Sequence, residues 1–276
     1  MAACTKRAAE RSGCAGAQTA RHGACAGSAG AQDTLRRVPW RPARQGGAAL
    51  LLLLAVAGLG AATLLISVFG KQNLEALRER RTQARLAQAS DALVGFAAQH
   101  GRLPRPAVSA TDGRESAEPC DSEAACSGFL PWVALAVEGA DSWGKVLRYS
   151  VTPEYTRAPL LRISAVATKR VQTRDGHGNL VYAVGHDVCL LYAQCAPAVV
   201  FSQGRNNLGT SVAGVAQANG AQGNVDEQGN DGAVLSFMQR AASDNPAAPG
   251  GVFDDLLLPL ALPTLYERMA TARALP

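Results

Sequence analysis

Acidic residues are almost missing from the first 47 positions of this 276-residue chain. This stretch holds eight Lys and Arg residues but only Glu10 and Asp33, a formal charge of +6. The remainder holds 19 basic and 20 acidic residues (27 minus 8, and 22 minus 2), a charge of −1. Nucleic-acid-binding domains need a basic face. Because the remainder has no excess of positive charge, the composition argues against a nucleic-acid partner.

The sequence also lacks the patterns of enzyme active sites. Ser202 lies in Val200-Phe201-Ser202-Gln203-Gly204, which has Val where a nucleophile elbow has its first Gly. His177 and His186 fall in a turn and at the end of a strand, positions that favour a solvated side chain over a catalytic base. No Gly-rich phosphate loop follows a predicted strand. We therefore expect a protein that is not an enzyme and that uses no cofactor.

Charged residues are absent from the run Ala48 to Phe69. A helix needs about 20 apolar residues to cross the hydrocarbon core, so the run predicts a transmembrane helix. A cleaved signal peptide is the alternative, but its apolar region is about 7–15 residues long. Basic residues lie before the run, and the positive-inside rule then keeps the N-terminus in the cytoplasm. The sequence predicts a single-pass membrane protein whose C-terminal part lies on the far side.

The tail over residues 1–47 is predicted to be a disordered, basic, cytoplasmic segment. Its first 35 residues are rich in Ala, Gly, Ser, Thr and Gln and have no hydrophobic periodicity, so they cannot bury a core. Sequence upstream of the true start codon is an alternative, and the two interpretations stay open.

The helix is expected to continue beyond the apolar run as an amphipathic segment over residues 70–101. No Pro occurs between Gln72 and Gln99, and four apolar residues there share one helix face. They are Leu86, Ala89, Leu93 and Phe96. His100-Gly101, followed by Pro104, is a typical helix end.

Residues 102–276 are predicted to form the head. The strand-like stretches are Val146–Thr152, Leu160–Ala167, Leu180–Val184 and Ala198–Ser202. Arg174 to Asn179 is a hairpin turn, Asn206 to Asp231 a long loop, and Thr264 to Ala272 a terminal helix. The predicted fold class is α+β, with a long N-terminal helix (a transmembrane half plus an amphipathic half) packed on a small antiparallel-sheet head.

The seven cysteines divide at the apolar run. Three lie in the tail, where thiols stay reduced, and Cys120, Cys126, Cys189 and Cys195 lie in the head. Equal five-residue spacers favour two local disulfides, Cys120–Cys126 and Cys189–Cys195, although three connectivities are possible. A zinc site with His177 and His186 is the alternative, but zinc ligands are usually spaced more closely.

Two further sets of residues suggest binding. Asp226, Glu227, Asn230 and Asp231 offer oxygen ligands to Ca²⁺, but their spacing differs from an EF-hand loop and favours a solvated acidic loop. Ala55, Gly58 and Ala62 lie at i, i+3 and i+7 in the apolar run. Small residues allow helices to approach closely, so these three predict a helix-packing surface.

Several segments resemble type IV pilins and the pseudopilins of type II secretion systems. The order of basic flank, Gly, apolar run and amphipathic helix is similar to theirs. Ala140-Asp141-Ser142-Trp143-Gly144 resembles their Asp-x-Trp-Gly segment, and Ala198 to Gly204 and Phe253-Asp254-Asp255 resemble segments of large proteobacterial members. The resemblance implies a leader cleaved after Gly46 or Gly47, a bacterial inner-membrane location with a periplasmic head, and assembly with other subunits on an inner-membrane platform.

The chain departs from the family pattern at one position. The family has Glu as the fifth residue after the leader Gly, whereas this chain has Leu51 or Leu52 there. A minor, priming or accessory subunit of a pilus or secretion filament therefore fits better than a major pilin. The alternatives are a membrane-tethered periplasmic ligand-binding module and, less favoured, an anchored hydrolase.

Overall fold

The computed structural model describes residues 46–191 and 194–276, and the side chains of residues 64–70 are outside the description. The tail predicted to be disordered thus lies outside the described residues up to position 45. The chain divides into two compact units, residues 1–57 and 58–276. The helices are α1 (Gly46–His100), α2 (Trp132–Leu135), the 3-10 helix η1 (Pro153–Thr156), α3 (Val225–Asp231) and α4 (Leu262–Thr271). The strands are β1 (Ser127–Phe129), β2 (Arg148–Val151), β3 (Arg170–Arg174), β4 (Leu180–Val184), β5 (Ala198–Ser202), β6 (Ser236–Met238) and β7 (Leu256–Pro259).

No helix within the described residues has both the length and the apolar content that a membrane crossing requires. The predicted transmembrane helix over Ala48–Phe69, and the single-pass inner-membrane localisation that rests on it, are therefore wrong.

The C-terminal part of α1 packs against the head through one face, as the periodicity predicts. Leu86, Ala89, Leu93 and Ala97 are 0–2% exposed, and Phe96 is partly buried beside them. The helix ends at His100, and Gly101 follows with φ +68°. Gly adopts this left-handed conformation without steric cost, which is why it so often follows a helix.

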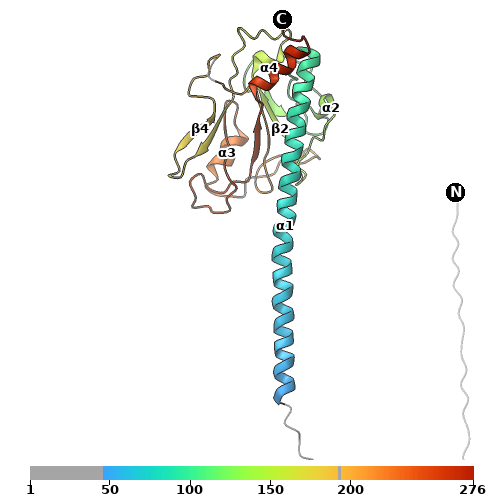
Figure 1. Cartoon of the computed structure of the whole chain (residues 1–276), viewed down its shortest axis with the longest axis vertical. Helices are drawn as coiled ribbons and strands as arrows, with labels where there is room; N and C mark the ends of the chain where they lie inside the picture. The colour runs from blue at the N-terminus through green and yellow to red at the C-terminus, as the bar shows by residue number, and fades with distance from the viewer. Residues whose placement is uncertain (1–45, 192–193) are drawn as a thin grey trace, which may run out of the picture. The chain divides into compact units, whose positions relative to one another are not determined.

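The strands form two sheets. The larger has the order β1-β2-β5-β7 and is antiparallel throughout. The smaller has the order β4-β3-β6, with β3 antiparallel to β4 and parallel to β6. Figure 1 shows α1 and α4 beside the larger sheet, with β4 on the far side of the head.

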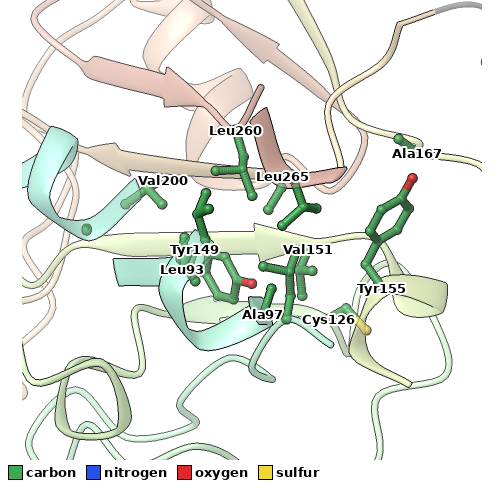
Figure 2. Close-up of a cluster of buried hydrophobic side chains, with 14 of the residues drawn as sticks. Leu93, Ala97, Cys126, Tyr149, Val151, Tyr155, Ala167, Val200, Leu260 and Leu265 are labelled. Atoms are coloured by element: carbon green, nitrogen blue, oxygen red, sulfur yellow. The ribbon is translucent and has the colours of Figure 1, made fainter. Parts of the chain in front are cut away.

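β5 lies between two apolar layers, because all five of its residues are buried. Side chains alternate between the two faces of a strand. Ala198 and Val200 join the main core with α1 and α4, whereas Val199 and Phe201 join a second cluster with Phe237 of the smaller sheet. Figure 2 shows the main core, where Leu93 and Ala97 of α1 approach Tyr149 and Val151 of β2. The larger sheet is thus the central layer of the head.

The predicted single antiparallel sheet is wrong in two respects. The head has two sheets, and one of them contains a parallel pair, β3–β6. In addition, Leu160–Ala167 is not a strand. The amides of Ser164 and Ala165 donate to the Leu161 carbonyl, so this segment turns on itself, and β3 supplies the hairpin partner of β4 instead.

Both predicted disulfides are present. Cys120 is bonded to Cys126 and Cys189 to Cys195, with Cα–Cα distances of 5.1 and 5.9 Å. Each closes a short loop at the edge of the main core, where Cys120, Cys126 and Cys195 are buried. The cysteine pairs are therefore structural, and the zinc alternative is not needed.

Leu93→Asp should destabilise the head strongly, because it places a carboxylate in a fully buried apolar site. We expect the free energy of unfolding to fall by about 3 kcal/mol or more, measured by urea denaturation of the full chain. Gln88→Asp, on the exposed side of the same helix, should change it by less than about 0.5 kcal/mol. Equal effects of the two substitutions would contradict the assigned packing face.

Candidate functional site

The N-terminal part of α1 exposes an unusual number of large apolar side chains. The side chains of Leu50 to Leu54, Val56 and Leu59 are 62–69% exposed. Ala55, Gly58 and Ala62, the predicted packing residues, are exposed on the same helix, and a Cβ added at Gly58 would meet nothing within 4 Å. Large exposed apolar surfaces mark interaction sites in proteins. Gly46 and Gly47, the possible leader-processing residues, form the start of this helix.

The Asp-x-Trp-Gly segment fastens the head to α1. The Asp141 carboxylate accepts hydrogen bonds from the amides of Trp143 and Lys145, both at 2.9 Å. The Trp143 ring nitrogen donates to Glu75 of α1 at 2.9 Å, and the Arg85 guanidinium of α1 donates to the Ala140 carbonyl at 3.0 Å. The motif thus acts as a clamp on the helix.

Ser202 belongs to the same network. Its side chain is fully buried, and its hydroxyl donates to Asp141 at 2.6 Å and accepts from the amide of Gly204 at 3.1 Å. His177 and His186 lie instead in and after the β3–β4 hairpin. The geometry therefore gives Ser202 the role of joining β5 to the clamp.

Three carboxylates converge beside this network. Glu227 of α3, Asp254 and Asp255 each place an oxygen within 4.8 Å of the others, and this is the one such acidic group among the described residues. Glu227 accepts from the amide of Asp254 at 3.0 Å, and Asp255 accepts from the Asn230 amide group at 2.8 Å. Oδ1 of Asp254 is buried without a hydrogen-bond partner among the described residues. Such a set of oxygens is of the kind that holds a hard cation.

Burial of this cluster shifts the pKa values of two of its carboxyl groups. Loss of solvent raises the pKa of Asp254 to about 6, with repulsion from Glu227 as the next cause. The pKa of Asp255 is raised well above its ordinary value, again mainly by burial. Burial and the nearby negative charges thus make Asp254 and Asp255 hold their protons to higher pH than exposed aspartates do.

Lys145 supplies positive charge to the same place. Its ammonium donates to the backbone carbonyls of Gln203 and Asn207 at 3.1 and 3.0 Å, and also to that of Asn206. Burial lowers the pKa of Lys145, while the charges of Asp254 and the other nearby carboxylates oppose this effect. An ammonium held by three carbonyls and compensated by carboxylates makes the cluster a fixed part of the fold. The cluster as built is therefore a structural ion network.

The residues predicted as Ca²⁺ ligands do not come together. Asp226 pairs with Arg174 at 2.6 Å and with Arg240 at 2.7 Å. Asn230 donates to the carbonyl of Met238, and Asp231 accepts from Gln203. Only Glu227 of the four joins the three-carboxylate group. Sequence spacing missed Asp254 and Asp255 as its partners, because they lie 27 and 28 positions further along the chain; their Asp-Asp pair in the family-like Phe253 segment was the available signal.

Comparison of the chain with protein family models, with curated proteins and with solved structures finds no match. The function of the chain therefore has to be inferred from its own residues.

The raised pKa of Asp254 makes the free energy of unfolding depend on pH in a defined direction. A group whose pKa is higher in the folded state stabilises the fold below its unfolded pKa of about 3.8, and this contribution is lost as the pH rises through about 6. Asp254→Asn removes the titration. Relative to wild type, this variant should gain about 2–3 kcal/mol in the free energy of unfolding between pH 4 and pH 7.5, measured by urea denaturation.

Asp112→Asn, at an exposed carboxylate in the surface loop before β1, is the matched control and should track wild type across the same range. A difference between Asp254→Asn and wild type that does not change with pH would show that Asp254 is not the titrating group.

Proposed function

We propose that this chain is a pilin-like structural subunit, minor, priming or accessory in role, that assembles with copies of itself and with similar subunits through α1. The observation that supports the proposal is the difference in burial between the two ends of α1. Residues from Leu86 onward are buried in the chain's own head, whereas Leu50 to Leu59 remain exposed. An apolar helix segment with no covering surface in its own unit is suited to packing against other helices.

Small residues on this segment support helix-to-helix contact. Ala55, Gly58 and Ala62 share one side of α1, and no described atom approaches a Cβ placed at Gly58. Small side chains shorten the distance at which two helix axes can pack. We infer that this side forms the contact between subunits, flanked by the exposed leucines.

The family-like segments are consistent with this role. The clamp formed by Asp141 and Trp143 attaches the head to α1, so that movement of the helix into an assembly carries the head with it. Absence of Glu at the fifth position after Gly46 or Gly47 removes the charge that family members are thought to use to align with the preceding subunit. This absence supports a minor, priming or accessory position in the assembly.

Substituting both Gly58 and Ala62 by Leu should weaken self-association at least about tenfold, or about 1.4 kcal/mol, because the larger side chains hold two helices apart. Sedimentation velocity of the purified full-length chain measures the effect. The head should keep its two disulfides and its unfolding midpoint.

Ala57→Leu combined with Gly60→Leu is the matched control. It makes the same two chemical changes on the roughly opposite side of the helix, at 100° per residue, and should leave association close to wild type. If wild type does not self-associate, or if the two double variants behave alike, the assembly proposal fails.

A further inference from the structure

Both edges of the larger sheet are protected against pairing with a further strand. An open edge strand can pair with a strand of another chain, and folded proteins usually prevent this. On the outer side of β1, Phe129 exchanges two backbone hydrogen bonds with Ala107, at 2.9 and 3.0 Å. On the outer side of β7, the Gln239 side chain donates to the Leu257 carbonyl at 3.2 Å, and Pro259 has no amide to offer.

The smaller sheet, of order β4-β3-β6, is protected at one edge. On β6, the side chain of Asn230 accepts from the Met238 amide at 2.6 Å and donates to the Met238 carbonyl at 3.0 Å. It therefore takes the place of a neighbouring strand. On β4, no described residue outside β3 bonds to the backbone. Leu180–Val184 also contains neither a charged residue nor a proline, the residue types that protect open edges.

The outward backbone groups of β4 belong to two residues. The amide of Asp175 donates to the carbonyl of Asn179 at 2.9 Å, so Asn179 bonds inward, across the hairpin. Inward and outward residues alternate along an antiparallel pair. Val181 therefore bonds to β3, whereas Leu180 and Tyr182 direct their amides and carbonyls away from it. Figure 1 shows β4 at the outside of the head, away from α1, where another chain can reach it.

We propose that this edge pairs, antiparallel, with β4 of a second copy of the chain, about a two-fold axis at Val181. This register places Leu180 of each copy opposite Tyr182 of the other. Both outward residues of both copies then exchange hydrogen bonds, four in all. A two-fold axis at Leu180 or at Tyr182 would give two such bonds and leave the other outward groups unpaired. The backbone of the edge thus matches itself in one register.

The side chains of β4 fit the same register. Residues directly opposite one another share a face of the sheet, so on one face each Leu180 lies beside the Tyr182 ring of the other copy. On the other face the two Val181 side chains meet. Leu180 and Val181 are 51% and 41% exposed in the single chain, so pairing covers apolar surface. No charge of β4 opposes the contact.

The contact joins the same surface of both copies, so it closes a dimer and extends two three-stranded sheets into one of six strands. It goes beyond the proposed function and does not rest on it, because residues 180–182 lie in the head and α1 takes no part. Two heads can pair in this way whether or not their helices assemble.

Cysteine cross-linking in the full-length chain tests the register. Cys4, Cys14 and Cys25 are replaced by Ser, and Val181→Cys is introduced. Opposite residues of a non-hydrogen-bonded antiparallel pair have Cα atoms about 4.5 Å apart, within reach of a disulfide. Ala183→Cys, also exposed on β4, is the matched control, because in this register its two copies lie about 13 Å apart along the strands. Under mild oxidation, Val181→Cys should form a covalent dimer at least about tenfold faster than Ala183→Cys.

Blocking the edge gives an independent reading. Leu180→Lys, added to the Val181→Cys chain, should slow formation of the covalent dimer about tenfold, because a lysine on an edge strand opposes pairing. Leu161→Lys is the matched control, at a leucine of the head that is 50% exposed, and should leave the rate unchanged.

The outcomes separate this contact from assembly through α1. Gly58→Leu with Ala62→Leu, added to the Val181→Cys chain, should leave the cross-linking rate unchanged, and loss of the cross-link there would overturn β4 pairing as an independent contact. Equal cross-linking at Val181→Cys and Ala183→Cys, or none at Val181→Cys, would overturn the register. Equal effects of the two lysine substitutions would show that the β4 edge is not the contact.

Discussion

Packing of Leu93 and its neighbours on α1 against the larger sheet is the contact on which the rest of the head depends. That face of the helix covers one side of β2 and β5, and the smaller sheet covers the other side of β5 through Val199 and Phe201. Because β5 is buried on both sides, neither layer can be removed without exposing its apolar residues. The clamp at Asp141 then fixes the position of the head along the helix axis, through the hydrogen bonds that Glu75 and Arg85 of α1 make with it.

The same constraint leaves most of the surface of α1 available for the proposed assembly. Only one side of the helix is used by the head, and the remaining sides of residues 71–99 are mostly exposed. Further toward the N-terminus, every described apolar side chain from Leu50 to Leu59 is exposed. A helix that is apolar all round needs cover on all sides, which one head cannot provide. In the proposed assembly, contacts with other subunits supply that cover.

The ion network beside the clamp has a different role. Glu227, Asp254 and Asp255 bring three carboxylates together. The Lys145 ammonium, whose charge opposes theirs, donates to the carbonyls of the loop after β5. Truncating one member of a buried group of charges leaves its partners uncompensated. The resulting loss of folding free energy is larger than the stabilisation that the whole group provides. The network therefore specifies one arrangement of the loops that surround α3.

Local features of the fold could be predicted from the sequence, and features that depend on distant partners could not. Leu180–Val184 and Ala198–Ser202 match β4 and β5, and the end of α1 at His100 follows from Gly101 and the prolines beyond it. β3 and β6 were missed because Arg170–Arg174 is mostly polar and Ser236–Met238 is short. Pairing with other segments makes them strands: β3 lies between β4 and β6, and β6 pairs with β3.

The candidate site shows the same limit. The disulfides could be predicted, since each joins cysteines six positions apart. The carboxylate group could not, because Glu227 meets Asp254 and Asp255 only after the chain has folded back from α3. The transmembrane prediction failed as well, because no helix within the described residues has the length and apolar content of a membrane crossing.

Cysteine cross-linking between copies tests assembly through α1 most directly. Cys4, Cys14 and Cys25 are replaced by Ser, and a single Cys is then introduced at Gly58 or, on the roughly opposite side of the helix, at Leu53. A disulfide requires two Cα atoms within about 7 Å. We expect the Gly58→Cys chain to form a covalent dimer under mild oxidation and the Leu53→Cys chain to do so far less. Equal cross-linking at both positions, or none at Gly58→Cys, would contradict assembly through this side of α1.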